Sequence, residues 1–292
     1  MQNTLNSKKY YKVQLSHIEI AVSEWGSDNG RPVIALHGWL DNMASFYPLL
    51  THSNWLKDNN LRVISLDWPG HGHSGHRHPS HPYNLLEYVQ DLHDTLQALN
   101  LEKVILLGHS MGAGLATLYA GAHPQKVEQL LLIEGLSPLI QEEAEAPEQL
   151  AKSIEHRNRH LKRGEMYYQD LDLVIKARIQ DTDLSRDNVA LLVERNMKKT
   201  AKGYRWRSDP RLRLPSAIRL SFNQIQAFIN NLSMPVLLIY GDHGFIEKYP
   251  QFSGMVKAYS HVDAVQLSGG HHLHMEYPEA VAKILIEKIK PC

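Results

Sequence analysis

Residues 104–112 read Val-Ile-Leu-Leu-Gly-His-Ser-Met-Gly, a short apolar run that leads into the pattern Gly-x-Ser-x-Gly. The run is typical of a strand buried on both faces, and the Ala- and Leu-rich residues 111–122 predict a helix directly after it. A serine at such a sharp strand-to-helix turn takes strained backbone angles, and the flanking glycines leave room for close packing. We therefore interpret Ser110 as a nucleophile at a helix N-terminus, where backbone N–H groups favour developing negative charge.

Short apolar runs of the same kind recur along the chain, bounded by turn residues. They lie at residues 33–36, 63–66, 104–107, 130–133, 236–240 and 262–267. The three- and four-residue spacing of apolar side chains predicts an amphipathic helix at 85–99, and a final helix is expected at 278–290. Strands that alternate with helices in this way predict an α/β fold with a mostly parallel central sheet and right-handed crossovers.

The stretch 136–215 breaks this alternation. It opens with an acidic segment at 141–148, continues through helical and strand-poor sequence, and becomes basic at 195–213. We interpret it as a mostly helical cap, or lid, inserted after the sixth strand, with 1–135 and 216–292 forming the core domain. The alternative is a run of ordinary helices in one continuous domain.

The composition is that of a folded globular protein, and it excludes several other classes of protein. The 292 residues are 43% hydrophobic, and 31 basic side chains balance 31 acidic ones. The overall charge therefore predicts binding to neither nucleic acid nor a charged membrane surface. The single cysteine, Cys292, excludes an internal disulfide framework and a zinc ribbon. No stretch approaches the roughly 18 apolar residues of a membrane span, and the first residues lack the apolar core of a signal peptide. We expect a cytoplasmic monomer or homodimer that acts on a small molecule.

A second loop, His37-Gly38-Trp39, follows the first of the apolar runs. Its glycine lets the backbone turn so that the N–H of Trp39 joins the N–H of Met111 in an oxyanion hole. We expect His37 to orient this loop beside the substrate. Trp68 is expected to line the substrate pocket, although core packing predicts the same residue type.

Three histidines, at positions 271, 272 and 274, follow the last predicted strand. A base on this loop can reach a serine at the middle of the sheet, and the position directly after two glycines favours His271 over His272. His274 is expected to pack under the loop.

The motif His37-Gly38-Trp39-Leu40-Asp41-Asn42, together with Gly-His-Ser-Met-Gly around Ser110, resembles the α/β-hydrolase superfamily over about 13–290. Within it the chain resembles the serine hydrolase-like (kraken-type) proteins, which are related to epoxide hydrolases and haloalkane dehalogenases. Those two relatives carry aspartate where this chain has Ser110, which implies acyl transfer in place of alkyl-enzyme chemistry. The resemblance also implies Ser110 as nucleophile, His271 as general base, the two N–H groups named above as oxyanion donors, and the insert as a lid.

The acid of the expected triad departs from the family's usual pattern. In many relatives it is the last residue of Gly-x-x-Asp after the strand that matches 236–240, but here that frame ends in Gly244. Two carboxylates can replace it: Glu134, where some relatives place their acid, and Asp242, two residues before the vacant position. Both preserve the chain order Ser, acid, His, so order does not choose between them. We favour Glu134, with Glu247 as a third and more remote option.

These features predict a serine hydrolase that cleaves a small or medium carboxylic ester through an acyl-enzyme and needs no cofactor. The same groups can hydrolyse a thioester, a lactone or a carbon–carbon bond next to a ketone. Two further alternatives are an acyltransferase or perhydrolase and a ligand-binding homologue without turnover, because a fold alone does not establish catalysis.

Two groups of polar residues stand outside this interpretation. Five histidines at 71–81 invite a metal interpretation, but a turn motif explains the first two and no HExxH pairing accompanies the others, so no metal site is expected. The basic side chains at 195–213 could attract a phosphate-bearing or acidic substrate, such as a coenzyme A thioester, or form a solvated face of the cap.

Overall fold

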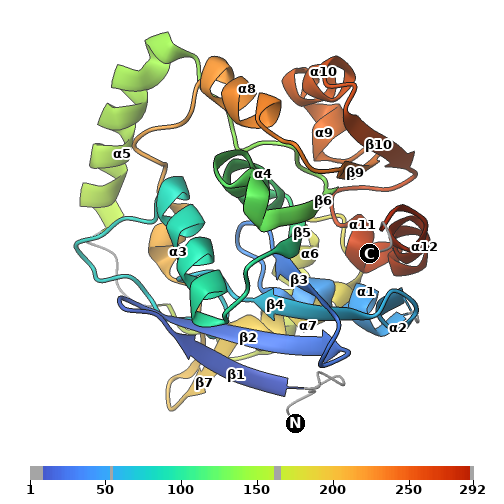
Figure 1. The fold of residues 1–292 in the computed structure, drawn as a ribbon. Helices are drawn as coiled ribbons and strands as arrows, with labels where there is room; N and C mark the ends of the chain where they lie inside the picture. Colours follow the sequence, from blue (N-terminus) through green and yellow to red (C-terminus); the bar gives the residue numbers. More distant parts are fainter. Residues whose placement is uncertain (1–8, 53–54, 161–165, 290–292) are drawn as a thin grey trace.

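An eight-stranded sheet forms the centre of the structure, a computed structural model that describes residues 9–52, 55–160 and 166–289 (Figure 1). The strands are β1 Lys9–Gln14, β2 Glu19–Gly26, β3 Arg31–Leu36, β4 Leu61–Leu66, β5 Val104–His109, β6 Val127–Ile133, β9 Val236–Gly241 and β10 Val262–Leu267. Their order is β1-β2-β4-β3-β5-β6-β9-β10. The β1–β2 and β2–β4 pairs are antiparallel, whereas every pair from β4 to β10 is parallel. This confirms the mostly parallel α/β sheet predicted from the sequence.

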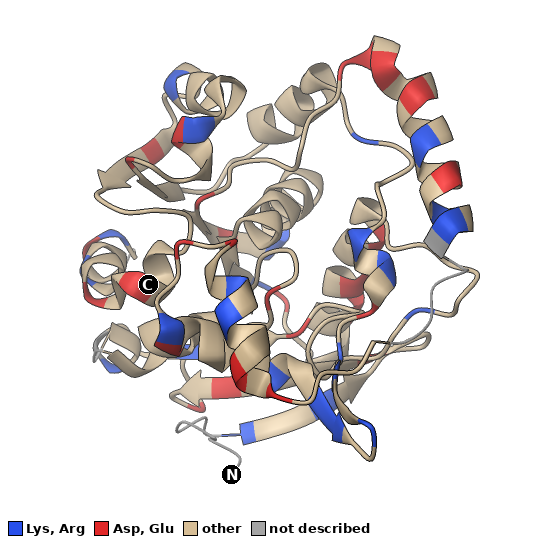
Figure 2. Ribbon diagram, turned by 180° about the vertical axis from the view of Figure 1, so that it is seen from behind, with Lys and Arg blue, Asp and Glu red and all other residues tan. Residues whose placement is uncertain are grey.

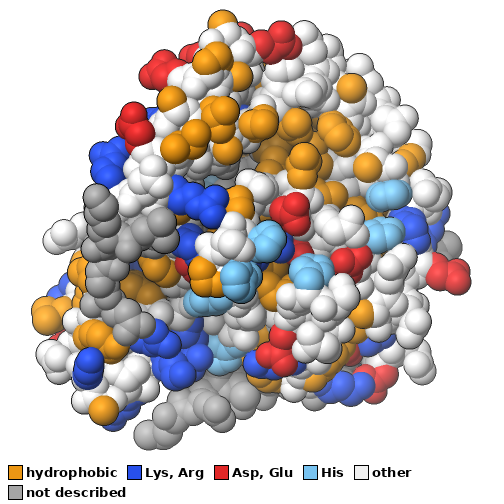
Figure 3. All heavy atoms as spheres, turned by 90° about the vertical axis from the view of Figure 1, so that its left-hand side faces the viewer, with side chains coloured by type: hydrophobic (Ala, Val, Ile, Leu, Met, Phe, Trp, Pro, Cys, Tyr) orange, Lys and Arg blue, Asp and Glu red, His pale blue; other side chains and the backbone are white. Residues whose placement is uncertain are grey.

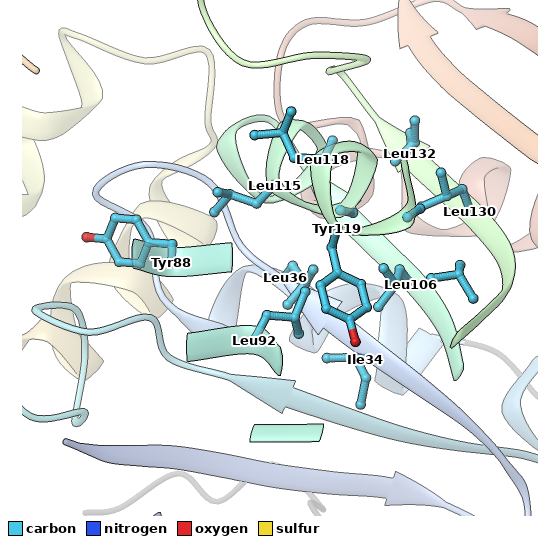
Figure 4. Packing of buried hydrophobic residues seen from close by; sticks show 14 of the residues in the cluster. Ile34, Leu36, Tyr88, Leu92, Leu106, Leu115, Leu118, Tyr119, Leu130 and Leu132 are labelled. Carbon is cyan, nitrogen blue, oxygen red and sulfur yellow. The ribbon is translucent and has the colours of Figure 1, made fainter. Parts of the chain in front are cut away.

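Helices cover both faces of this sheet. The core elements are η1 Met43–Phe46, α1 Tyr47–His52, α2 Trp55–Asp58, α3 Leu85–Ala98, α4 Met111–Ala122, η2 Pro124–Lys126, α9 Phe245–Lys248, α10 Pro250–Ala258, α11 Leu273–Glu276 and α12 Pro278–Lys288. Side chains of β3 alternate between the two faces. Ile34 and Leu36 pack with α3 and α4 (Figure 4), while Val33 and Ala35 join the cluster that includes α1 and α12. The central strands are therefore buried on both sides, as their continuous apolar sequences predict.

The segment between β6 and β9 supplies a second group of elements. They are η3 Glu143–Glu145, α5 Ala146–His160, α6 Leu171–Ile179, α7 Arg186–Asn196, β7 Met197–Thr200, β8 Gly203–Trp206, η4 Pro210–Arg213 and α8 Phe222–Asn230. Buried side chains of α6 and α7, including Val174 and Leu192, form a hydrophobic cluster of their own with Met275 of α11. In contrast, Ile225 and Ile229 of α8 pack into the main core. Acidic residues gather at the start of α5 (Figure 2), as the sequence predicts.

Sequence and structure differ mainly at two places. The antiparallel strands β1 and β2 were not predicted: β1 is an edge strand with mostly exposed side chains, and β2 is buried but mixes polar with apolar residues. The hairpin β7–β8 lies in a region that was expected to be helical, and Gly203 helps to close its turn with a φ of 114°. By contrast, α4 and β10 match their predicted limits, and the final helix ends at Lys288. Residue 290, where that helix was expected to end, lies outside the described residues.

Among the described residues, no helix combines the length and the apolar character needed to cross a membrane.

Candidate active site

Ser110 lies at the junction of β5 and α4, where the backbone turns sharply. Its φ of 52° and ψ of −115° lie far from ordinary strand or helix values, as expected for a strained turn. The turn is possible because its neighbours are glycines: a Cβ on Gly112 would lie 2.0 Å from the carbonyl oxygen of Leu36, and one on Gly108 would lie 2.5 Å from Cα of Ala113. The local sequence thus presents Ser110 at the carboxyl end of a central strand.

His271, in the loop between β10 and α11, reaches this serine. Its Nε2 lies 2.9 Å from Oγ of Ser110, and its Nδ1 lies 3.2 Å from Oε2 of Glu134. Ser110 and Glu134 follow neighbouring parallel strands, β5 and β6, so both side chains emerge at one end of the sheet. The three side chains form one continuous hydrogen-bonded line from carboxylate to imidazole to hydroxyl.

The structure brings Glu134 to this line, and the other two candidate acids bond elsewhere. Glu134 is fully buried, and its two oxygens accept hydrogen bonds from the backbone N–H groups of Gly241, at 2.6 Å, and Phe245, at 2.5 Å. Asp242 is exposed and bonds with the ring of His243 at 2.6 Å and the N–H of Gly269 at 3.0 Å. Glu247 accepts a bond from the side chain of Gln266.

The Glu134 carboxylate lies beside position 244, where the sequence lacks the aspartate that many relatives carry. A Cβ on Gly244 would lie 2.1 Å from Oε1 of Glu134, so the Glu134 carboxylate lies where a side chain at 244 would begin. Any larger residue at 244 would therefore force the Glu134 carboxylate to shift.

The loop after β3 lies directly against Ser110. A Cβ on Gly38 would lie 3.2 Å from Cβ of Ser110, which brings the backbone around Trp39 close to the serine. In the described part of the chain, the backbone N–H groups of Trp39 and Met111 donate to no other residue, so both are available to a ligand. The Trp39 side chain is 53% exposed, and its indole N–H donates to the carbonyl of Leu212, in the segment between β6 and β9, at 2.9 Å.

His37 and Trp68 hold this loop in place through hydrogen bonds. His37 Nδ1 bonds with the carbonyl of Gly38 at 2.8 Å, and its Nε2 accepts the backbone N–H of Trp68 at 3.0 Å. The indole of Trp68 donates to the carbonyl of His37 at 3.1 Å. Burial lowers the pKa of His37, which agrees with a neutral ring in this role. Both side chains are fully buried; the hydrogen bonds of His37 agree with its expected role of orienting the loop, and contact of either side chain with substrate stays a prediction.

Comparison with known proteins places the chain in a family. Residues 31–278 match the family described as the alpha/beta hydrolase fold. The chain belongs to this family.

Similar proteins refine the assignment of this α/β hydrolase. A serine hydrolase-like protein of Danio rerio is 27% identical, over 94% of this chain and 86% of its own length. The crystal structure of a hypothetical protein from Pseudomonas aeruginosa PAO1 superposes with a TM-score of 0.89 at 35% identity, covering 96% of this chain and 98% of that one. The thioesterase domain of the curacin biosynthetic pathway gives a TM-score of 0.82 at 26% identity, covering 96% of this chain and all of its own. The predicted resemblance to serine hydrolase-like proteins is confirmed, and the family supports a hydrolase activity.

The second histidine of the loop, His272, has partners that sequence reasoning missed. Its Nε2 lies 3.3 Å from Oδ2 of Asp41, and its Nδ1 lies 3.2 Å from Oδ1 of Asp183. Burial lowers the pKa of His272, but the two carboxylates outweigh it and raise the pKa to about 9. In this hydrolase His272 is therefore a fixed cation at neutral pH.

This ion-pair network joins the α6–α7 region to both active-site loops. Asp183 also accepts the backbone N–H of His271 at 2.6 Å, and Arg178 of α6 donates to Oδ1 of Asp41 at 2.9 Å. Asp41 belongs to the motif after β3 and could have been singled out from the sequence. Asp183 lies in a loop without any recognisable pattern, and only the folded chain brings it to His271.

The other histidines singled out in the sequence pack against or bond with protein groups. His274 lies fully buried under the loop, as predicted, with its ring centroid 5.2 Å from that of Phe46 and 4.3 Å from that of His109. Burial lowers the pKa of His274 to about 3, so its ring is neutral. The histidines at 71–81 bond to other protein groups, mostly oxygen atoms: His71 with the carbonyl of Pro69, and His76 with that of Arg207.

One group of side chains in the described structure has the composition of a metal site. Asp41, His109 and His272 each offer one ligating atom, and these atoms lie within 4.8 Å of one another. A metal would have to displace the proton of His272, which already bridges two carboxylates and has its pKa raised to about 9. The electrostatics therefore favour a proton at this position.

Figure 3 looks onto the side of the hydrolase where α5 lies. Hydrophobic side chains gather over α5 and α8 in its upper part, and histidine side chains lie below them. Exposed hydrophobic residues of these elements and the segments beside them are Leu139, Leu150, Ile154, Ile218 and Phe222.

Proposed function

We propose that this hydrolase cleaves a small or medium carboxylic ester through an acyl-enzyme on Ser110. The observation that carries the proposal is the hydrogen-bonded line from Glu134 through His271 to Ser110, with the 2.9 Å contact between Nε2 and Oγ. A serine is a weak nucleophile by itself and becomes effective when a base removes its proton. His271 is within reach to do so, and Glu134 orients its ring.

The reaction divides into two acyl transfers. In the first, His271 takes the proton of Ser110 while Oγ attacks the ester carbonyl, and the N–H groups of Trp39 and Met111 stabilise the negative oxygen of the tetrahedral intermediate. The intermediate collapses when His271 gives that proton to the leaving alcohol. In the second, His271 takes a proton from water, the resulting hydroxide attacks the acyl carbonyl, and the returning proton restores Ser110 as the acid leaves.

Glu134 is proposed as the acid of the triad because its carboxylate faces the Nδ1 side of His271. An ionised carboxylate there selects the tautomer with a free lone pair on Nε2 and stabilises the imidazolium that forms during attack. Backbone N–H donors from Gly241 and Phe245 fix its orientation.

The segment 136–215 is proposed as the cap over this site. Its α6 and α7 have a hydrophobic cluster separate from the main core, and Arg178 and Asp183 bond to both active-site loops. A cap of this kind buries the substrate and excludes bulk water. The exposed hydrophobic side chains around α5 and α8 favour an apolar acyl group.

A thioester is the second candidate substrate. The observation that favours it is the likeness to the curacin thioesterase domain, at 26% identity and a TM-score of 0.82. The same serine chemistry applies to both substrates, because only the leaving group differs.

The test is hydrolysis of a p-nitrophenyl ester series of increasing chain length, with matched acyl thioesters alongside. Wild type and Ser110→Ala are compared, and both are incubated with a fluorophosphonate probe. We expect turnover and labelling in the wild type and neither in the variant. Labelling with preferred thioester turnover would favour the second candidate. A wild type that neither labels nor turns over would favour a ligand-binding homologue and contradict the proposal.

A further inference from the structure

The carboxylate of Asp183, in the loop between α6 and α7, contacts the histidine loop, residues 268–272 between β10 and α11. Its Oδ2 accepts the backbone N–H of His271 at 2.6 Å, and its Oδ1 lies 3.2 Å from Nδ1 of His272. The fit is close, because a Cβ on Gly270 would lie 1.7 Å from Oδ2 of Asp183. The hydrogen bond with His272 lowers the pKa of Asp183, so this carboxylate is ionised at neutral pH. A charged acceptor therefore bonds to the backbone of the proposed general base.

Two further hydrogen bonds fix the position of Asp183 relative to the histidine loop. The backbone N–H of Ser185 donates to Oε1 of Glu276 at 2.7 Å, and Nδ2 of Asn188 donates to the carbonyl of Met275 at 2.9 Å. Both acceptors belong to α11, the helix that directly follows the histidine loop. The start of α7 and the start of α11 are thus joined on the carboxyl-terminal side of Asp183, which makes the carboxylate part of a fixed contact.

The end of α6 holds the other active-site loop, which carries Trp39. Arg178 donates to Oδ1 of Asp41 at 2.9 Å, and its two terminal nitrogens lie 3.4 and 3.5 Å from the carbonyl oxygen of Leu40. Leu40 has a φ of 61°, a backbone conformation that persists only where the surrounding structure supports it. Arg178 and Asp183 are close in sequence, so one short segment is bonded to both loops of the proposed active site.

The backbone of His271 is held at both of its polar groups. Asp183 accepts its N–H, and Nε2 of His109 donates to its carbonyl at 2.9 Å. The ring bonds to Ser110 at 2.9 Å and lies 3.2 Å from Glu134. A shift of the backbone would move the ring relative to both of these partners, and catalytic rates fall steeply when a catalytic group is displaced by about 1 Å.

We propose that Asp183 is a positioning residue, whose carboxylate holds the backbone of His271 so that Nε2 stays within hydrogen-bonding distance of Ser110. The inference rests on the proposed function, because it assigns Asp183 to the same reaction. Asp183 acts through the main chain of His271 and takes no part in proton transfer. The segment 136–215, proposed above as the cap, then contributes to the rate of the reaction in addition to covering the site.

Steady-state hydrolysis of a p-nitrophenyl ester by three variants tests the proposal. Asp183→Ala should lower kcat roughly 10- to 100-fold and change KM by less than about twofold, because the base is displaced while the substrate pocket keeps its shape. Asp183→Asn keeps an oxygen that can accept the N–H of His271 and should stay within about fivefold of the wild type. Asp181→Ala is the matched control: it removes an exposed carboxylate of the same loop that bonds to neither active-site loop in the described structure, and should match the wild type.

Thermal melts of the same variants separate positioning from stability. Asp183→Ala and Asp183→Asn both lose the ion pair with His272, so both should melt below the wild type and at similar temperatures. If activity followed stability alone, the two variants would lose kcat equally. Equal losses of kcat, or a loss that appears only in KM, would overturn the proposal.

Nuclear magnetic resonance of protein with isotope-labelled histidine measures the position of His271 without substrate. The proton on Nδ1, which faces Glu134, should be visible in the wild type and in Asp183→Asn, and broadened by exchange with water in Asp183→Ala. Its disappearance in His271→Ala identifies the signal. If the wild type neither turns over esters nor reacts with a fluorophosphonate, the proposed function fails while this measurement still tests the inference. An unchanged signal in Asp183→Ala would overturn it.

Discussion

His271 and His272 are neighbours on one loop, yet their surroundings give them opposite properties. His271 lies between Ser110 and Glu134 and has one side turned to a hydroxyl that it can deprotonate. His272 lies between Asp41 and Asp183, which raise its pKa to about 9 in spite of burial. One imidazole can exchange a proton during a reaction, and the other keeps it. The difference comes from the carboxylates that the fold brings to each ring, since the residue type is the same.

The largest expected effect tests the division of roles between the two rings. His271→Ala should lower kcat by about 10⁴-fold or more, because among the described residues no other base is hydrogen-bonded to the Ser110 hydroxyl. His272→Gln should cost roughly tenfold, through looser positioning of the loop. Steady-state kinetics on a p-nitrophenyl ester, with fluorophosphonate labelling, measures both. A greater loss in His272→Gln than in His271→Ala would reverse the assignment.

The next effect concerns the carboxylate behind His271. Glu134→Gln should lower kcat by about 10³- to 10⁴-fold, because the ring loses the partner that fixes its tautomer. Asp242→Asn is the matched control and should stay within about twofold, since Asp242 is exposed and bonds elsewhere. Equal losses in the two variants would contradict the assignment of Glu134.

A smaller effect concerns the charge on His272 and appears as pH-dependent stability. Its pKa rises from 6.5 to about 9 in the folded protein, so the folded state binds its proton more tightly than the unfolded state does. The resulting stabilisation, roughly 3 kcal/mol, is fully present below pH 6.5 and is lost as the pH rises through about 9.

Thermal melts between pH 6 and pH 10 measure this effect. The wild type should lose stability across that interval, while Asp183→Asn should begin less stable and show a shallower decline. His272→Gln is the control that removes the titrating group. A variant curve parallel to that of the wild type would show that another group is responsible.

The smallest effect tests the loop that carries Asp41. Trp39→Phe removes the indole bond to Leu212 but keeps the backbone N–H that faces the proposed oxyanion. We expect KM to rise roughly two- to fivefold with kcat nearly unchanged, because one partly exposed hydrogen bond is lost. A large fall in kcat would mean that the indole, and not only the backbone, supports the chemistry.

Local sequence was sufficient to predict the strand-to-helix turn at Ser110, the proposed nucleophile. The apolar run, the glycines and the helical sequence around Ser110 are contiguous, so the turn that presents it could be predicted from one short stretch. The parallel strands were equally clear, because burial on both faces produces continuous apolar runs. Exposed β1 lacks that signal and was missed.

Long-range contacts could not be predicted in the same way. The choice between Glu134 and Asp242 depends on how the ends of β6 and β9 face His271, and both acids fit the chain order equally well. Asp183 reaches His271 from a position 88 residues away, in a loop with no periodic pattern. Trp68 was expected to line the pocket although core packing predicts the same residue type, and its complete burial could not be predicted from the sequence.

The close approach of Glu134 to Gly244 has an evolutionary consequence. The two positions compete for one space, so an aspartate at 244 would have to displace the Glu134 carboxylate, and losing Glu134 first would remove the carboxylate beside Nδ1 of His271. Movement of the acid between the two strands therefore requires both changes together, or passage through an impaired intermediate. The double variant Glu134→Gly with Gly244→Asp would make both changes at once. The activity lost in either single variant would measure how strongly the intermediate is impaired.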